Sequence, residues 1–249
     1  REAAMLYSAE GERVAKCFQI ARALRMAAEY SEYERFWFVY QCDFRGRIYA
    51  ATSGLSPQGS DTAKALIHFA DGKRLGESGV RWLAIHGANV YGYDKVSFAD
   101  RVAWVHKNSE AIVRTARDPL SQREFWGNAD KPWCFLAFCF EWEGVVRSGA
   151  SHVSALPVAI DGSCNGLQHF SALLRDPVGG AATNLCRSDK PADIYTKVAA
   201  VCTESLRRTS DAVDREWLAF CAKHGDGVIP RALAKKPVMT LPYGSTKRA

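Results

Sequence analysis

The sequence of 249 residues predicts an α+β fold that is mostly helical and contains a small antiparallel sheet. Three observations lead to this prediction. Apolar residues recur at helical spacing over most of the chain. Strand-like segments, rich in aromatic and β-branched residues, are few. The content of 47% hydrophobic and 24% charged residues is typical of a folded globular protein, which excludes a mostly disordered chain and a collagen-like repeat.

The first 70 residues are expected to form a long helix, a hairpin and a shorter helix. Apolar residues recur every three or four positions over residues 9–30, which predicts an amphipathic helix. Residues 36–41 predict a strand, a turn follows at residues 43–46, and residues 47–50 predict the returning strand. Asp61 follows a loop and is expected to cap a helix that ends near residue 70.

Helices dominate the prediction for the rest of the chain. They are expected at residues 77–91, 98–116, 132–147, 167–174, 191–208, 213–223 and 231–242. Pro237 and Pro242 are expected to disturb the last of them. His86 and His169 lie within apolar helices, so we expect both to be hydrogen-bonded core residues.

Charge and cysteine content limit the possible partners. The net charge is +6, and residues 222–249 hold six basic residues against one acid, which indicates either an anionic partner or a solvated basic face. The eight cysteines show neither a CxxC pair nor zinc-finger spacing, so we expect a reducing compartment without disulfides or structural zinc. No apolar run approaches the roughly 20 residues of a membrane span, so no membrane partner is expected. Because the chain begins with Arg1 and shows no structural stop at its other end, we interpret it as a piece of a longer protein.

Asp161 is the first candidate for chemistry. The apolar residues 156–160 predict a buried strand, and this strand ends in Asp161-Gly162-Ser163. A carboxylate at a sheet edge is costly without a counterion, and its oxygens suit a hard cation such as magnesium. The alternative is an ordinary turn aspartate, because Asp-Gly is a common turn dipeptide.

The second candidate is the basic segment that begins at Arg231. If residues 231–242 are helical, Arg231 and Lys235 lie four residues apart on one face, and Tyr243 borders that face. Two cations beside a phenol could bind a polyphosphate that carries a ribose and a base. The alternative is a basic surface helix with Tyr243 in the core.

Other basic residues are candidates for contacts with a nucleic-acid backbone. Arg45 and Arg47 flank Gly46 in the predicted hairpin and could hold successive phosphates, or could be solvated. Lys64 and Lys95 are weaker candidates, for which a surface position is the simpler interpretation. The Gly-rich phosphate-binding loops and the Gly-x-Ser-x-Gly hydrolase motif are absent.

Four segments in the same order and with similar spacing resemble the single-subunit DNA-dependent RNA polymerases of bacteriophages and mitochondria. The matching segments are Asp43-Phe-Arg-Gly-Arg-Ile-Tyr-Ala50, Ile85-His-Gly-Ala-Asn89, Asp161-Gly-Ser-Cys-Asn-Gly-Leu-Gln-His169 with Arg175-Asp176, and Lys235-Lys-Pro-Val-Met-Thr-Leu-Pro-Tyr-Gly244. Residues 135–141 add to the match, which extends over nearly the whole chain.

The resemblance implies part of a right-hand polymerase. Residues 1–33 would be the end of the thumb, residues 34–177 the first portion of the palm, and residues 178–249 the start of the fingers. The implied activity is DNA-templated RNA synthesis by nucleotidyl transfer. Its implied partners are a DNA template, the RNA product and ribonucleoside triphosphates, and its cofactor is magnesium. The parent enzyme would be a monomer in the cytoplasm of a phage-infected host or in the mitochondrial matrix.

The resemblance also assigns roles to residues. Asp161 matches the first of two aspartates that hold two magnesium ions, and the carbonyl of Gly162 matches a further metal ligand. Arg231 and Lys235 match cations that bind the incoming triphosphate, and Lys235 would also protonate the leaving group. Tyr243 matches a tyrosine that helps to select ribonucleotides.

The remaining assignments concern nucleic acid and substrate. Arg45 and Arg47 match arginines near the template–RNA hybrid. Lys64 and Lys95 fall near the hybrid or the triphosphate, Lys64 being assigned to nucleic acid and Lys95 to substrate.

The chain departs from the family pattern in one respect that bears on activity. The second catalytic aspartate, which the family places in a His-Asp-Ser turn downstream, is missing from these 249 residues. We therefore expect the chain by itself to be inactive. Two alternatives stay open: a nucleic-acid-binding module without catalysis, and a fragment of a family A DNA polymerase. An Asp161→Asn variant would test the first and ribonucleotide preference the second.

Overall fold

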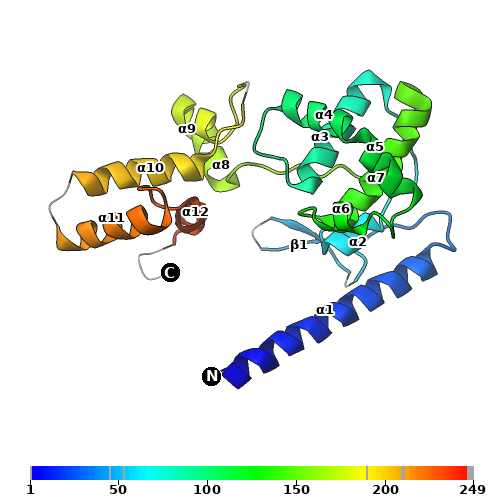
Figure 1. Ribbon diagram of the computed structural model, residues 1–249, viewed down its shortest axis with the longest axis horizontal. Coiled ribbons are helices and arrows are strands. Elements are labelled where there is room, and N and C mark those ends of the chain that lie inside the picture. Colours follow the sequence, from blue (N-terminus) through cyan, green and yellow to red (C-terminus); the bar gives the residue numbers. More distant parts are fainter. Residues whose placement is uncertain (1, 45, 53, 189, 209–210, 246–249) are drawn as a thin grey trace. The chain divides into compact units, whose positions relative to one another are not determined.

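The computed structural model describes all residues except 1, 45, 53, 189, 209–210 and 246–249. Its contacts divide the chain into two compact units, Arg1–Ala159 and Ile160–Ala249, called unit 1 and unit 2 below. In both units most described residues are helical, and the strands are short and antiparallel. The predicted mostly helical α+β fold is therefore confirmed (Figure 1). Among the described residues, no helix combines the length and the apolar character that crossing a membrane would require.

Unit 1 holds seven helices, one short 3₁₀ turn and four strands among its described residues. In chain order they are α1 (Glu2–Tyr30), β1 (Tyr40–Cys42), β2 (Ile48–Ala50), α2 (Asp61–Ala65), β3 (Lys73–Arg74), α3 (Gly76–Tyr91), α4 (Phe98–Lys107), α5 (Ser109–Arg117), α6 (Arg123–Gly127), α7 (Pro132–Ser148), η1 (Gly149–Ser151) and β4 (Val153–Ser154).

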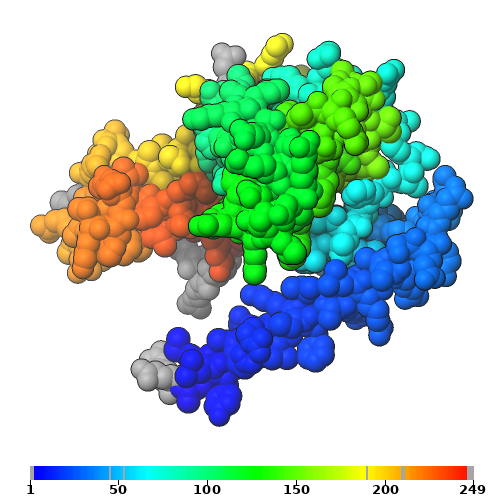
Figure 2. Space-filling view, turned by 45° about the vertical axis from the view of Figure 1, so that its right-hand side comes forward, coloured from blue at the N-terminus to red at the C-terminus, as the bar shows by residue number. Residues whose placement is uncertain are grey.

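Helix α7 is the centre of unit 1 and packs against α2, α3, α5 and α6. Its apolar face buries Phe135, Phe138 and Trp142 almost completely. Helix α3 approaches so closely that a Cβ atom on Gly87 would lie 2.2 Å from Cζ of Phe138. Only glycine allows this packing, because real Cβ atoms do not come that close to a ring. Helix α1, by contrast, is exposed along nearly its whole length, with Ala23 buried (Figure 2).

The caps of α2 and α7 differ from the prediction. Ser60, not Asp61, caps α2, because its hydroxyl accepts the N–H of Ala63. The carboxylate of Asp61 instead accepts the N–H groups of Trp133 at 2.7 Å and Cys134 at 3.1 Å. It thus satisfies free N–H groups at the start of α7, 72 residues further along the chain.

Strands form two separate two-stranded ladders. β1 pairs with β2 as the predicted hairpin, and β3 pairs with β4. The predicted buried strand at residues 156–160 is wrong: this segment is not a strand, and Ile160 is 93% exposed. A strand needs a neighbour for its backbone groups, and none of the described residues forms a ladder with this segment. Pro157 also lacks the N–H that a ladder would use.

Other boundaries differ locally. The helix predicted at 98–116 is two helices, because the backbone of Asn108, with φ of −97° and ψ of 8°, leaves the helical range between α4 and α5. Helix α2 ends at Ala65, five residues before the predicted end. His86 is buried as expected, but His169 is exposed on α8, so its predicted core position is wrong.

Unit 2 is helical in its described part. Its elements are α8 (Asn165–Leu174), α9 (Pro177–Ala182), α10 (Ile194–Arg207), α11 (Ala212–His224), α12 (Arg231–Thr240) and the 3₁₀ turn η2 (Leu241–Tyr243). Helix α10 packs against both α11 and α12, and α8 packs against α9. Helix α12 continues through Pro237 and tightens into η2 only at Leu241. The disturbance predicted from the two prolines is therefore a change of helix type that begins at Leu241, directly before Pro242.

Candidate active site

Asp161 lies in the loop that leads into α8 and is exposed. Its Oδ1 accepts the backbone N–H of Gly162 at 2.8 Å. A Cβ atom on Gly162 would come within 2.1 Å of Oδ1 of Asn165 and 2.7 Å of Oε1 of Gln168, so a larger residue would displace both amides. The side chains of Asn165 and Gln168 thus pack against the loop at Gly162, while the carboxylate of Asp161 faces solvent.

Cys164 fixes the end of this loop. It precedes α8 with φ of 58°, a left-handed conformation that is costly for a residue other than glycine. Its buried thiol lies 3.9 Å from the carbonyl oxygen of Val238, which belongs to α12. Two residues further on, a Cβ atom on Gly166 would lie 2.8 Å from Cβ of Pro242 and 3.4 Å from Cζ of Tyr243. The loop that carries Asp161 is therefore seated directly on α12 and η2.

Helix α12 begins with Arg231, which faces the start of α10. Its Nε donates to Oδ2 of Asp193 at 2.5 Å, and its guanidinium lies 5.1 Å from the ring centre of Tyr195. Burial raises the pKa of Asp193, but the bonds and charge of Arg231 and the bonds from Thr196 outweigh burial, so the pKa is lower than usual. Burial, reinforced by Cys164, raises the pKa of the Tyr195 hydroxyl.

Lys235 and Tyr243 are exposed on the same part of unit 2. Lys235 lines a shallow hollow of about 220 Å³ along α12, together with Ala232, Lys236, Met239 and Thr240. Tyr243 ends η2, is 61% exposed and packs over Gly166. The alternative of Tyr243 as a core residue is excluded by this exposure.

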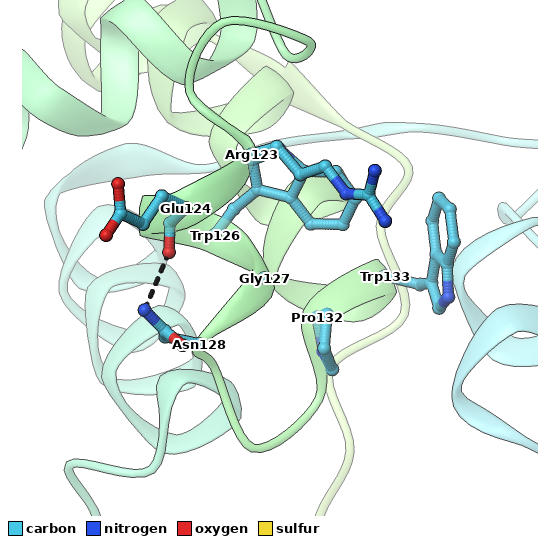
Figure 3. Close-up of a pocket in the computed structure, with 7 residues that line it drawn as sticks. All are labelled: Arg123, Glu124, Trp126, Gly127, Asn128, Pro132 and Trp133. Atoms are coloured by element: carbon cyan, nitrogen blue, oxygen red, sulfur yellow. Dashed lines mark hydrogen bonds between the residues drawn. The ribbon is translucent and has the colours of Figure 1, made fainter.

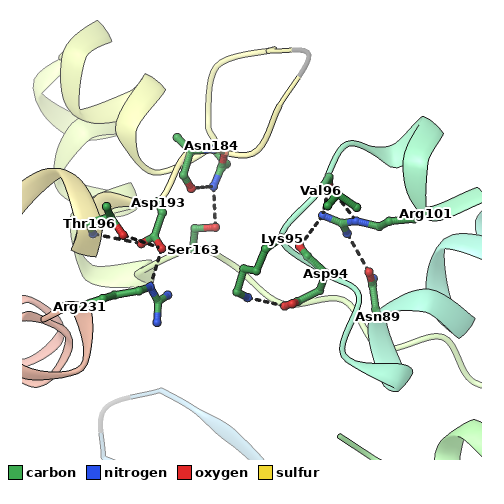
Figure 4. Close-up of polar contacts among 11 residues, drawn as sticks. Asn89, Asp94, Lys95, Val96, Arg101, Ser163, Asn184, Asp193, Thr196 and Arg231 are labelled. Carbon is green, nitrogen blue, oxygen red and sulfur yellow. Dashed lines mark hydrogen bonds and ion pairs between the residues drawn. The ribbon is translucent and has the colours of Figure 1, made fainter. Parts of the chain in front are cut away.

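Asn184 connects the Asp161 loop to α10. Its side chain donates to Oγ of Ser163 at 2.8 Å and exchanges two bonds with the backbone of Ala192, which directly precedes Asp193 (Figure 4). The structure thus brings Asp161, Gly162, Arg231, Lys235 and Tyr243 into one compact unit, on elements that contact one another.

The candidates in unit 1 lie on separate elements. Arg47 is an exposed residue of the β1–β2 turn, where its N–H bonds Oδ1 of Asp43. Lys64 is half-buried in α2. Lys95 is exposed after α3 and pairs with Asp94. Arg45 lies outside the described residues.

Asp193, Tyr195 and Asn184 were not predicted from the sequence to belong to the site. The helix predicted at 191–208 includes Asp193 in its first turn. In the structure α10 begins at Ile194, and Asp193 caps it by accepting the N–H groups of Tyr195 and Thr196. Its second role depends on Arg231, 38 residues away, and no local pattern signals it.

A further hollow, of about 500 Å³, lies between α6 and the start of α7 in unit 1 (Figure 3). Its lining residues are Arg123, Glu124, Trp126, Gly127, Asn128, Pro132 and Trp133. None of the residues predicted to act in chemistry lines it.

The donor set at Asp161 is oxygen-rich but small. Magnesium prefers oxygen ligands and commonly takes only one or two carboxylates from a protein, the rest coming from water and phosphates. One exposed carboxylate and the neighbouring carbonyl of Gly162 fit such a partial site. In the part of the chain that the structure describes, no group of three or more His, Cys, Asp or Glu side chains could hold a metal ion by itself.

Comparison with known proteins agrees with this arrangement. A family model for DNA-dependent RNA polymerase matches residues 73–249. T7 RNA polymerase of Escherichia phage T7 is 40% identical over 98% of this chain. The DNA-directed RNA polymerase of Enterobacteria phage T3 is 39% identical over 98% of the chain, and the mitochondrial DNA-directed RNA polymerase of Mus musculus is 40% identical over 94%.

The match covers only part of these relatives. The chain spans 30% of the length of both phage enzymes and 20% of the mouse enzyme. The resemblance carried by the four motifs is confirmed nonetheless, because the matched region includes both the Asp161 loop and α12. The chain belongs to the DNA-dependent RNA polymerase family.

Proposed function

We propose that this chain forms part of the catalytic region of a DNA-directed RNA polymerase, which joins ribonucleoside triphosphates into RNA on a DNA template. One observation carries the proposal: in unit 2 the loop with Asp161 packs on the helix with Arg231 and Lys235. Family membership alone would not require these residues to share one unit. This packing supports a site in which a carboxylate holds a metal ion and two cations bind a triphosphate.

Each residue has a role that follows from its chemistry. Arg231 and Lys235 bind phosphate oxygens through charge-assisted hydrogen bonds. Lys235 also donates a proton to the departing pyrophosphate. Tyr243 would lie beside the sugar and favour a ribonucleotide, because the 2′-hydroxyl offers a hydrogen-bonding group that a deoxyribose lacks.

Magnesium is the cofactor that the proposal requires. When bound, it activates the attacking 3′-hydroxyl and neutralises charge on the triphosphate. Asp161 and the carbonyl of Gly162 would hold it, with the triphosphate supplying further oxygens. Because these are few protein ligands, we expect the 249-residue chain to bind nucleotide but to lack robust template-dependent synthesis.

The family layout also suggests how the chain is divided. We assign residues 1–33 to the end of the thumb, 34–177 to the palm and 178–249 to the start of the fingers. The separate long helix α1 supports the first boundary. Arg45, Arg47 and Lys64 are assigned to the template–RNA hybrid and Lys95 to the substrate, in a monomeric enzyme of an infected host's cytoplasm or the mitochondrial matrix.

Binding of ATP to the 249-residue chain tests the proposal. We expect Lys235→Ala to weaken ATP binding about 10-fold, the value of one charge-assisted contact. Asp161→Asn should abolish the difference between binding in Mg²⁺ and in a chelator. Lys223→Ala, which removes an exposed lysine of α11, is the matched control and should change little.

The same assay separates the alternatives. A nucleic-acid-binding module would show no Mg²⁺-dependent ATP binding, and Asp161→Asn would leave its duplex affinity unchanged. A DNA polymerase fragment would bind dATP at least as tightly as ATP. Either result would overturn the proposal.

A further inference from the structure

The first turn of α10 is the part of unit 2 to which both halves of the candidate site attach. Asp193 pairs with Arg231, which begins α12. Ala192 exchanges two hydrogen bonds with Asn184, which in turn bonds Ser163 in the Asp161 loop. Both the metal-binding loop and the triphosphate-binding helix are therefore anchored on this turn.

Tyr195 adds a second anchor at the same place. Its ring lies under the guanidinium of Arg231 at 5.1 Å, within the range of a cation–π contact. The pKa of its hydroxyl is raised by burial and, to a smaller extent, by Cys164 at the end of the Asp161 loop. The guanidinium is thus held along its edge by a carboxylate and on its face by a ring.

The geometry of the Arg231–Asp193 pair leaves the functional edge of the arginine available. The bond to Asp193 uses Nε of Arg231, whereas an arginine binds phosphate best through two parallel N–H groups. Figure 4 shows the two terminal nitrogens of Arg231 turned away from Asp193. A long side chain that is already fixed loses less conformational entropy when a ligand binds.

We propose that Asp193 is a positioning residue that fixes Arg231 for the triphosphate of the incoming nucleotide. This inference rests on the proposed function, because it assigns Asp193 a task in the same site. Asp193 acts through Arg231 and does not touch the substrate. Its carboxylate removes some of the positive charge at Arg231, but the gain in orientation outweighs that loss.

The alternative is that Asp193 serves only as the cap of α10. Asp211 offers a matched comparison, because it caps α11 in the same way, by accepting the N–H of Val213. Among the described residues, no hydrogen bond or ion pair joins the side chain of Asp211 to the side chain of an arginine. A structural role at Asp193 would therefore be reproduced by a change at Asp211.

The experiment measures the dissociation constant of ATP with Mg²⁺ for the 249-residue chain and its variants, with thermal unfolding recorded for each. We expect Asp193→Ala to weaken ATP binding about 10-fold. Asp193→Asn keeps the cap and a neutral acceptor for Nε, so it should recover most of the affinity. Asp211→Ala should lower thermal stability by the amount expected for a lost helix cap but leave ATP binding within about twofold.

A second pair of variants tests whether the effect passes through Arg231. In an Arg231→Ala background, Asp193→Ala should cause no further loss, because the side chain it positions is gone. A further loss of the same size would overturn the proposal. So would unchanged or tighter ATP binding by Asp193→Ala, tighter binding meaning that Asp193 competes with the triphosphate for Arg231.

The failure of this proposal can be distinguished from that of the proposed function. If the unaltered chain binds no ATP, the proposed function fails and the role of Asp193 falls with it. If the unaltered chain binds ATP and Lys235→Ala weakens binding but Asp193→Ala does not, only the positioning role is wrong.

Discussion

Units 1 and 2 are both helical, but different side chains fill their interiors. In unit 1, Phe135, Phe138 and Trp142 are buried in a continuous apolar cluster. Among the described residues of unit 2, the largest buried side chain is that of Val238, and the fully buried ones include Thr183 and Thr203. Unit 1 is therefore stabilised mainly by removal of apolar surface from water, whereas unit 2 depends more on individual hydrogen bonds.

The difference matches the distribution of candidate residues. Unit 2 holds the candidate residues Asp161, Arg231, Lys235 and Tyr243, whose charged and polar ends lie wholly or partly exposed. A polar network such as Ser163–Asn184–Ala192 fixes backbone geometry without a large apolar core. We infer that unit 2 is the less stable of the two and the more sensitive to loss of single hydrogen bonds.

The largest expected effect is in the core of unit 1. Phe138→Ala should lower the free energy of unfolding by about 3–5 kcal/mol, because it leaves a cavity under Gly87 and Trp142. Urea unfolding followed by tryptophan fluorescence reports this, since six of the seven tryptophans lie in unit 1. Phe140→Ala, on the exposed side of the same helix, should cost less than about 1 kcal/mol. Equal losses from both variants would contradict the assigned core.

The second largest expected effect is the dependence of the stability of unit 1 on pH. Burial, assisted by the charge of Lys131, lowers the pKa of His86 to about 4, below its usual 6.5. The unfolded chain then binds the proton first, so stability is full above pH 6.5 and declines as pH falls towards 4. Between pH 7.5 and pH 5 the loss should be about 2 kcal/mol.

Urea unfolding at several pH values measures this decline. His86→Gln should reduce the decline of the free energy of unfolding with falling pH, whatever the variant's stability at neutral pH. His68→Gln, at an exposed position, should leave this decline unchanged. An unaltered slope in His86→Gln would show that other groups cause the decline.

Thr203 tests the polar interior of unit 2. Its hydroxyl donates to the carbonyl of Ala199 at 2.8 Å and accepts the N–H of Ile229 at 2.9 Å. Thr203→Val keeps the shape but leaves this N–H without its partner, which should cost about 1–2 kcal/mol. Thr203→Ser keeps the hydroxyl and should cost less. Thermal unfolding followed by circular dichroism ranks the two variants. The opposite order would mean that packing, and not hydrogen bonding, stabilises the contact between α10 and the segment before α12.

The smallest expected effect concerns the cap that joins α2 to α7. Asp61→Ala should cost about 1 kcal/mol, the usual value of a helix cap. Asp61→Asn should recover part of it, because an amide oxygen also accepts N–H groups. Thermal unfolding measures both, and no loss in Asp61→Ala would mean that solvent caps α7 equally well.

Much of the fold was predictable because its helices carry a strong apolar period. Residues 77–91 and 132–147 match α3 and α7 to within one residue at each end. The division of residues 98–116 into two helices was not predictable, because no periodic pattern reveals that the backbone of Asn108 leaves the helical range. The strand predicted at 156–160 is wrong, because composition does not reveal whether the backbone of a segment will form hydrogen bonds with a neighbouring strand.

The candidate site was predictable to the extent that its residues stand in recognisable motifs. Asp161, Arg231, Lys235 and Tyr243 were found in this way, and the structure places them in one unit. Asp193 and Tyr195 were missed because their contacts to Arg231 span more than 30 residues. A residue that positions another is recognised only once the chain is folded.

The carboxylate of Asp61 on the first turn of α7 also has a consequence for the order of folding. A contact between residues 72 positions apart forms only after the intervening chain has closed, and loop closure has an entropic cost that local helix formation does not. The amide protons of Trp133 and Cys134 should therefore become protected against exchange later than those in the middle of α7. Pulse-labelling during refolding would detect this delayed protection at the helix start. Removal of the carboxylate would abolish the protection of these two amides, because it removes their acceptor.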